Sequence, residues 1–144
     1  MIRCSDHVKH KLTDLLWDDH IERVAGMIGT IEGNDYIVRD VLPARNEDYR
    51  PSEEFYISGG QMAQLAREAQ RRGFILLGVA HSHLPHHPSV PSEADIHYCR
   101  HAVNAMFHPA SSTLSWFDST GELRRERLPV PAPAAAGFPV LAFV

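Results

Sequence analysis

The feature that most constrains the fold is a short apolar run that leads directly into two histidines. Residues 74–80 read FILLGVA, and His81-Ser82-His83 follow without a break. An apolar run of this length without a charged residue is typical of a strand that is buried on both faces. Because side chains alternate across a strand, we expect His81 and His83 to leave it on the same face. The chain is therefore predicted to present two imidazoles at the end of a central strand.

A carboxylate follows twelve residues after His83, at Asp95. Ser92 is predicted to open a helix, with Asp95 as its third residue. The intervening loop, LPHHPSVP, is short and holds three prolines, so it is expected to fold the start of the helix back over the two histidines. Two histidines and one carboxylate leave a fourth tetrahedral position for water, as in catalytic rather than structural zinc sites.

Each part of this constellation also has a simpler interpretation. A His-x-His at the end of a strand is compatible with a solvated pair. Ser92-x-x-Asp95 by itself is a helix capping box, although capping and metal ligation can coexist at one aspartate. Taken together, the parts predict one zinc ion held by His81, His83 and Asp95.

Glu22 is the candidate for the general base. It begins the mostly apolar run 21–31, IERVAGMIGTI, which is predicted to be a central strand. A carboxylate that leads into a buried strand is costly without a partner, and a zinc-bound water needs a base to take its proton. The alternative is a solvated glutamate at a strand end. Ser92 has a second possible role, since its hydroxyl could donate to the oxyanion formed during attack on a carbonyl.

The rest of the pattern predicts one α/β domain over residues 1–128. A helix capped by Ser5 is expected first, and residues 61–72 are predicted to form a second helix that Gly73 ends. Residues 129–144 read as a Pro/Ala-rich linker followed by an apolar tail. Besides the runs above, strands are predicted over residues 36–42, 55–58, 104–108, 113–118 and 122–128.

Composition narrows the function classes. The 144 residues carry a net charge of −4, which argues against a nucleic-acid-binding protein. No segment is apolar for long enough to span a membrane, no signal peptide is visible, and two cysteines are too few for a disulfide framework. We therefore expect a cytoplasmic protein. Five of its ten histidines lie between His81 and His97, which directs attention to metal.

These residues resemble the signature of the JAMM (MPN-plus, JAB-domain) zinc metalloproteases, in their prokaryotic form. The signature is a glutamate, then His-x-His, then Ser-x-x-Asp, and Glu22, His81-Ser82-His83 and Ser92–Asp95 match it in order. The resemblance implies a cytidine-deaminase-like sandwich, with a curved mixed β-sheet flanked by helices. It also implies that the two histidines and Asp95 bind zinc, that Glu22 is the general acid/base, and that Ser92 stabilises the oxyanion.

The same resemblance implies hydrolysis of an amide bond at the C-terminus of a ubiquitin-like or sulfur-carrier protein. Three departures are visible: Leu84 stands where the family usually has proline, Ala25 stands where many relatives have glycine, and the stretch from His83 to Ser92 is one residue longer than usual. Two other functions stay open, namely a zinc amidohydrolase for a small molecule and a metal-binding, non-catalytic interaction module. The loop residues His86 and His87 are interpreted as solvated, and the alternative is a contact with substrate or with a further ion.

An acidic segment provides the one hypothesis about substrate contacts. Residues 46–55, NEDYRPSEEF, precede the predicted strand at 55–58. A peptidase of this kind holds an extended substrate tail beside a sheet edge. Glu53 and Glu54 are therefore candidate substrate-binding residues for a tail with a basic residue before a small terminal pair. The alternative is an ordinary acidic surface loop.

Overall fold

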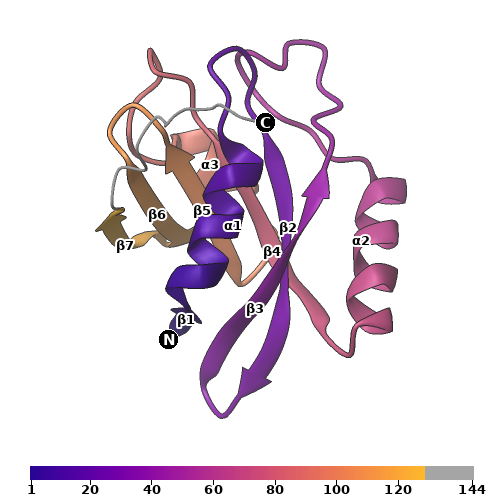
Figure 1. Ribbon diagram of the computed structural model, residues 1–144. Coiled ribbons are helices and arrows are strands. Elements are labelled where there is room, and N and C mark those ends of the chain that lie inside the picture. Colours follow the sequence, from indigo (N-terminus) through magenta and orange to yellow (C-terminus); the bar gives the residue numbers. More distant parts are fainter. Residues whose placement is uncertain (129–144) are drawn as a thin grey trace, which may run out of the picture.

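The computed structural model describes residues 1–128, which form one mixed sheet and three helices (Figure 1). The predicted linker and tail at 129–144 lie outside the described residues. The seven strands are arranged in the order β1-β3-β2-β4-β5-β6-β7. Their bounds are β1 Ile2–Cys4, β2 Val24–Glu32, β3 Asp35–Ala44, β4 Ile75–Ser82, β5 Val103–His108, β6 Thr113–Asp118 and β7 Gly121–Arg127.

The three helices begin at serine caps, as helix starts commonly do. They are α1 Asp6–Leu16, α2 Gly59–Arg71 and α3 Glu93–Tyr98, capped by Ser5, Ser58 and Ser92. The predicted caps Ser5 and Ser92 are confirmed. The helix α2 was predicted to begin at residue 61 and begins two residues earlier, at Gly59. The short helix α3 has no buried residue. In the described part of the chain, no helix is long and apolar enough to cross a membrane.

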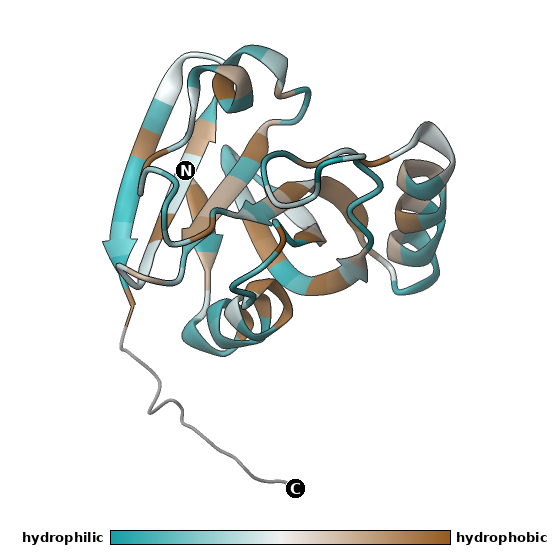
Figure 2. Cartoon of the chain, turned by 90° about the horizontal axis from the view of Figure 1, so that it is seen from above, coloured by the Kyte–Doolittle hydropathy of each residue, from teal (hydrophilic) through white to brown (hydrophobic). Residues whose placement is uncertain are grey.

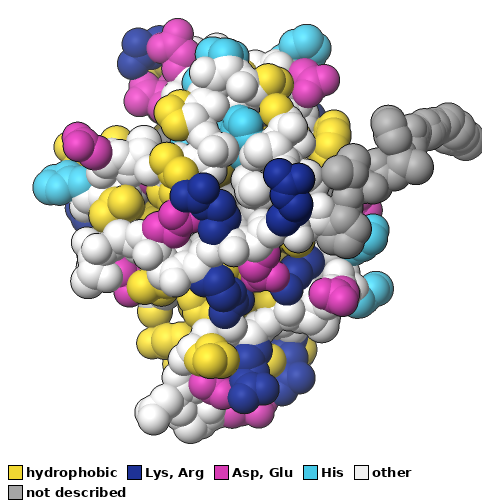
Figure 3. All heavy atoms as spheres, turned by 90° about the vertical axis from the view of Figure 1, so that its left-hand side faces the viewer, with side chains coloured by type: hydrophobic (Ala, Val, Ile, Leu, Met, Phe, Trp, Pro, Cys, Tyr) yellow, Lys and Arg dark blue, Asp and Glu magenta, His cyan; other side chains and the backbone are white. Residues whose placement is uncertain are grey.

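The sheet is mixed because two of its neighbouring pairs are parallel. β1 pairs with β3 and β4 with β5 in parallel, and the remaining pairs are antiparallel. The sheet curls so far that its two edges approach each other. Arg124 of β7 donates a hydrogen bond of 3.0 Å to the Ile2 carbonyl of β1, and Lys9 of α1 pairs with Glu126 of β7. Figure 3 views this side, where basic and acidic side chains alternate.

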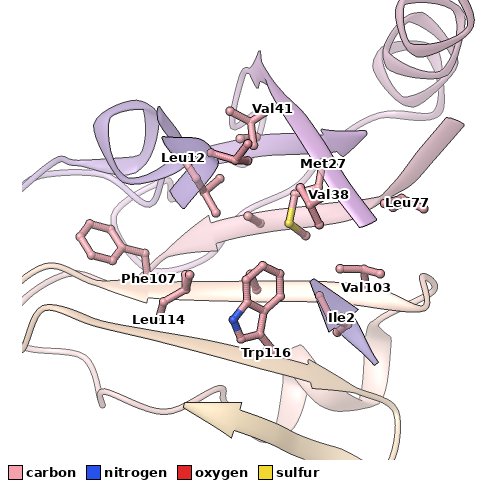
Figure 4. Close-up of a cluster of buried hydrophobic side chains, with 14 of the residues drawn as sticks. Ile2, Leu12, Met27, Val38, Val41, Leu77, Val103, Phe107, Leu114 and Trp116 are labelled. Carbon is pink, nitrogen blue, oxygen red and sulfur yellow. The ribbon is translucent and has the colours of Figure 1, made fainter. Parts of the chain in front are cut away.

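Two apolar clusters lie on opposite faces of the sheet. The larger one joins α1 to the sheet and includes Leu12, Met27 and Trp116 (Figure 4). The smaller one joins α2 to β2 and β3 through Ile28 and Leu65. Met27 and Ile28 are neighbours on β2 that point to opposite faces, so β2 is buried on both sides. This explains its mostly apolar sequence, whereas the edge strand β7 is hydrophilic along most of its length (Figure 2).

Two predictions about strands were wrong. The segment 55–58 belongs to no strand, because its backbone bonds to Asn46 and Glu47 instead of to a neighbouring strand. The three-residue β1 was missed, because three residues are too few to show a period in the sequence. The strand predicted from residue 21 begins at Val24, so Glu22 lies just before it.

Candidate metal centre

Three metal-ligating atoms converge at the end of β4. His81 lies in this strand and His83 follows its last residue, while Asp95 is the third residue of α3. The Asp95 Oδ2 atom is 3.2 Å from His81 Nε2 and 3.1 Å from His83 Nε2. One ligand atom from each of the three residues lies within 4.8 Å of the other two. The prediction that these side chains meet is confirmed.

The donor set fits a metal ion. The Nε2 atom of His81 is buried and lies 3.2 Å from Asp95 Oδ2 without the geometry of a hydrogen bond, and burial of a polar atom that makes no hydrogen bond is costly. Two ligand atoms that lie about 2.0 Å from a tetrahedral zinc ion are about 3.3 Å apart, close to the separations observed around Asp95. The Nδ1 atom of His83 lies 2.9 Å from the Pro88 carbonyl, a contact that leaves Nε2 free as a ligand.

The loop between His83 and Ser92 delivers Asp95 to this position. Asp95 Oδ2 accepts a hydrogen bond of 2.8 Å from the Ser92 amide, and the Asp95 amide donates to Ser92 Oγ at 3.0 Å. Burial raises the pKa of Asp95, but His81, with further hydrogen bonds from His83 and the Ser92 amide, lowers it far more, so the carboxyl stays ionised. The predicted capping box is therefore present and also holds an ionised carboxylate against two imidazoles.

Sheet pairing brings Glu22 to the same place. Val24 pairs with His81 across β2 and β4, and the Arg23 backbone exchanges two hydrogen bonds with Ser82, of 2.8 and 2.9 Å. Glu22 is only 3% exposed. Burial raises the pKa of its carboxyl to about 8, against a lowering by His83. The solvated alternative for Glu22 is therefore wrong.

A cleft of about 780 Å³ contains the whole constellation. The three candidate ligands, Glu22 and Ser92 all line it. One wall is the segment 53–57, in which the Phe55 ring stacks on His81 at 4.4 Å between ring centres. On another side the cleft is lined by residues of α3 and the segment after it, including Tyr98 and Arg100.

The two glutamates predicted to contact substrate line this cleft and stay solvated. The side chains of Glu53 and Glu54 are 61% and 50% exposed. Arg50 pairs with both, at 3.5 Å from Glu53 and 2.8 Å from Glu54. Their position agrees with the hypothesis of a substrate contact, while Arg50 offsets part of their negative charge.

The sequence interpretation missed His87, which it took as solvated. Its Nδ1 atom lies 3.1 Å from Glu22 Oε2, and its side chain is only 17% exposed. The neighbouring His86 is exposed, as expected. The Nε2 atom of His108 lies 3.1 Å from the His87 carbonyl. Nothing local in the sequence distinguishes the two loop histidines, because the contact with Glu22 depends on how the loop folds back.

Fold and site together define an α/β domain with a candidate metal centre of two histidines and one aspartate beside a buried glutamate. Residues 5–125 match the family described as prokaryotic homologs of the JAB domain. The chain belongs to this family.

Solved structures agree with the fold. A protein from Desulfitobacterium hafniense, determined in solution, superposes with a TM-score of 0.70 at 20% identity, over 88% of this chain and 90% of that one. A protein from Salinibacter ruber gives a TM-score of 0.55 at 20% identity, over 93% and 94% of the two chains. No curated protein matches the sequence.

Proposed function

We propose that the chain is a zinc-dependent isopeptidase or peptidase that hydrolyses the amide bond at the C-terminus of a ubiquitin-like or sulfur-carrier protein. The observation that carries the proposal is that His81, His83 and Asp95 meet in the cleft that also holds the buried Glu22. Membership of the JAB family supports it, since the resemblance to the JAMM signature implies this chemistry.

Zinc, when bound by the two histidines and Asp95, supplies a Lewis acid and lowers the pKa of a water molecule. Glu22 takes the proton of the attacking water on a carboxylate oxygen. Burial favours the neutral form of this carboxyl, so Glu22 holds the proton until the leaving amine accepts it. A cation held by the neighbouring ligands would favour the ionised form of the Glu22 carboxyl again, so that Glu22 can act as a base in the next cycle.

Ser92 is suited to stabilise the oxyanion. Its Oγ atom accepts a hydrogen bond from the Asp95 amide, so the hydroxyl proton is free to point into the cleft. A hydroxyl that donates to the carbonyl oxygen under attack stabilises the negative charge that develops there. The longer loop that precedes Ser92 leaves this arrangement intact.

An extended tail is the substrate shape that the cleft wall favours. Within residues 1–128, the backbone N–H and C=O groups of Phe55 and Ile57 make no hydrogen bond, whereas those of Tyr56 bond to Asn46 and Glu47 on the other edge. An extended peptide can pair with such a free edge beside the metal centre. The tail of a ubiquitin-like protein has this extended form and ends at the bond to be cut.

The first test is hydrolysis of a panel of ubiquitin-like and sulfur-carrier fusions, with and without a chelator, with the cleavage point read by mass spectrometry. Glu22→Gln is expected to keep its metal content and to lose activity by about 100-fold or more, because general acid–base catalysis is worth on the order of 10²–10⁴. Full activity of Glu22→Gln would rule out the mechanism. Metal uptake without hydrolysis of any fusion would favour a non-catalytic interaction module. Hydrolysis of small amides but of no fusion would favour a zinc amidohydrolase for a small molecule.

The second test concerns the acidic wall. We propose that Glu53 and Glu54 favour a tail with an arginine or lysine before its small terminal residues. Reversing both to lysine should lower kcat/KM for such a tail by about 10-fold and leave a neutral tail unaffected, because exposed charge pairs contribute about 1 kcal/mol or less each. A kcat/KM of the variant on the basic tail that is unchanged from the wild type would exclude this selectivity.

A further inference from the structure

The side chain of Asn46 bonds to five backbone groups around the cleft. It lies just after β3, in a stretch that belongs to no helix or strand. The two hydrogens of its Nδ2 atom serve three carbonyls, so that one hydrogen is shared between two of them, and its Oδ1 atom accepts from two amides. The partners are Glu22 O at 2.8 Å, Glu54 O at 3.0 Å, Pro51 O at 3.4 Å, Asp48 N at 3.0 Å and Tyr56 N at 3.1 Å.

These bonds connect two segments that are far apart in the sequence. One is the segment that carries Glu22, and the other is the stretch 47–57. A direct backbone bond supports the connection, since the Glu22 amide donates to the Pro51 carbonyl at 2.6 Å. The backbone of Glu22 is therefore held on both sides, through its amide by Pro51 and through its carbonyl by Asn46.

The stretch 47–57 ends in the segment 53–57, which forms a wall of the cleft. Glu53, Glu54 and Phe55 all line it, and Phe55 stacks on the candidate ligand His81. Because this stretch has no strand partner, the bonds to Asn46 satisfy backbone groups that regular secondary structure would otherwise satisfy. The position of the wall over the metal centre consequently depends on the same side chain that holds Glu22.

We infer that Asn46 is a positioning residue of the active site, which holds the base Glu22 and the stretch 47–57 with its substrate-binding wall as one unit. The effect of Asn46 on kcat that follows from this inference rests on the proposed function. The coupling itself is a property of the metal-free protein and is measurable without activity.

Three variants test the coupling. Asn46→Ala removes all five bonds. Asn46→Asp keeps the acceptor for the Asp48 and Tyr56 amides and removes the three donations, including the one to Glu22. Val8→Ala in α1, which truncates a buried core residue away from the cleft, is the control for a general loss of stability.

The first measurement uses the full chain in the presence of a chelator, at one fixed pH. In Asn46→Ala, amide hydrogen exchange in 47–57 is expected to rise at least 10-fold while β4 stays protected. The ring-current shift that Phe55 exerts on the His81 ring protons should shrink in the NMR spectrum. In Val8→Ala both signals should match the wild type.

The second measurement is kinetic and separates the two sets of bonds. Asn46→Asp should keep the Asp48 and Tyr56 amides protected. Its kcat should nevertheless fall at least 10-fold, because the Glu22 carbonyl has lost its donor and displacement of a catalytic group by about 1 Å can cost 100-fold. Metal content should stay at the wild-type level.

Two results would overturn the inference. One is exchange in 47–57 that rises no more in Asn46→Ala than in Val8→Ala. The other is a wild-type kcat in Asn46→Asp, which would limit Asn46 to ordering its own loop. If the wild type hydrolyses none of the fusions, the proposed function fails, whereas the exchange and NMR measurements still decide whether Asn46 couples Glu22 to the wall.

Discussion

At the scale of single residues, the carboxyl of Glu22 combines deep burial with acidic neighbours. Burial contributes most to its raised pKa, and Asp95, Glu54 and Asp48 raise it further, whereas His83 lowers it. An ordinary glutamate in the unfolded chain has a pKa near 4.5. The folded, metal-free protein therefore keeps a proton on Glu22 over a pH range in which the unfolded chain has lost it.

This difference makes stability depend on pH in a defined direction. Between pH 4.5 and about 8 the folded state binds more protons, so the free energy of unfolding should fall as pH rises and level off above that window. Because one pKa unit corresponds to about 1.4 kcal/mol, the free energy of unfolding should fall by a few kcal/mol at most over this window. Urea unfolding of wild type and Glu22→Gln with a chelator, from pH 4.5 to 9, measures it. Glu22→Gln should lack this component of the slope, and parallel curves would contradict the assignment.

The site residues differ in how far the sequence revealed them. His81, His83 and Asp95 were predictable because a strand and a capping box, both local patterns, place them. Glu22 needed the resemblance to a family, since its position relative to the ligands depends on pairing between β2 and β4. Asn46 and His87 carried no local signal, because their partners are reached only through the folds of two irregular loops.

At the scale of elements, the contact between β4 and β5 fixes the strand end that carries the histidines. Gly78 pairs with Val103 where these parallel strands begin to pair. A Cβ atom on Gly78 would lie 1.6 Å from the Val103 carbonyl oxygen, so no larger residue fits without a backbone shift. The pairing continues toward the site, where the His83 amide donates to the Phe107 carbonyl at 2.9 Å.

Gly78→Ala is therefore expected to destabilise the fold by about 1–3 kcal/mol, the range of a substitution that forces backbone movement in a packed core. Gly59→Ala is the matched control, because a Cβ atom at the start of α2 meets nothing within 4 Å. Urea unfolding of both variants measures the difference. If Gly78→Ala lowered the free energy of unfolding no more than Gly59→Ala does, the strands β4 and β5 would have to separate easily at this point.

Within residues 1–128, the sequence indicated every helix and strand except β1, which is too short to show a pattern. The helix α1 buries one face, and the strands β2, β4 and β6 are buried along most of their length. The segment 55–58 alternates like a strand, but side-chain and loop partners occupy one of its edges. Its sequence pattern therefore predicted a strand that the structure does not have.

At the scale of the whole molecule, the strand order and the curl of the sheet could not be predicted from composition and periodicity. The edges β1 and β7 approach through Arg124 and the Ile2 carbonyl, which are 122 residues apart in the sequence. Such contacts depend on the complete topology. The curved mixed sheet was expected only because the motif resembled a family, and the family match over residues 5–125 confirms that expectation.

The helix α3 has a consequence for how metal supply would act on this protein. It contributes no buried side chain, and Asp95 is the residue that joins it to the two histidines. Ala94 and Tyr98 of the same helix line the cleft. A cation bound by Asp95 would therefore also fasten α3 to the sheet. Under the proposed function, depletion of the ion would release one side of the cleft at the same moment as it stops hydrolysis, so the protein would lose recognition and chemistry together.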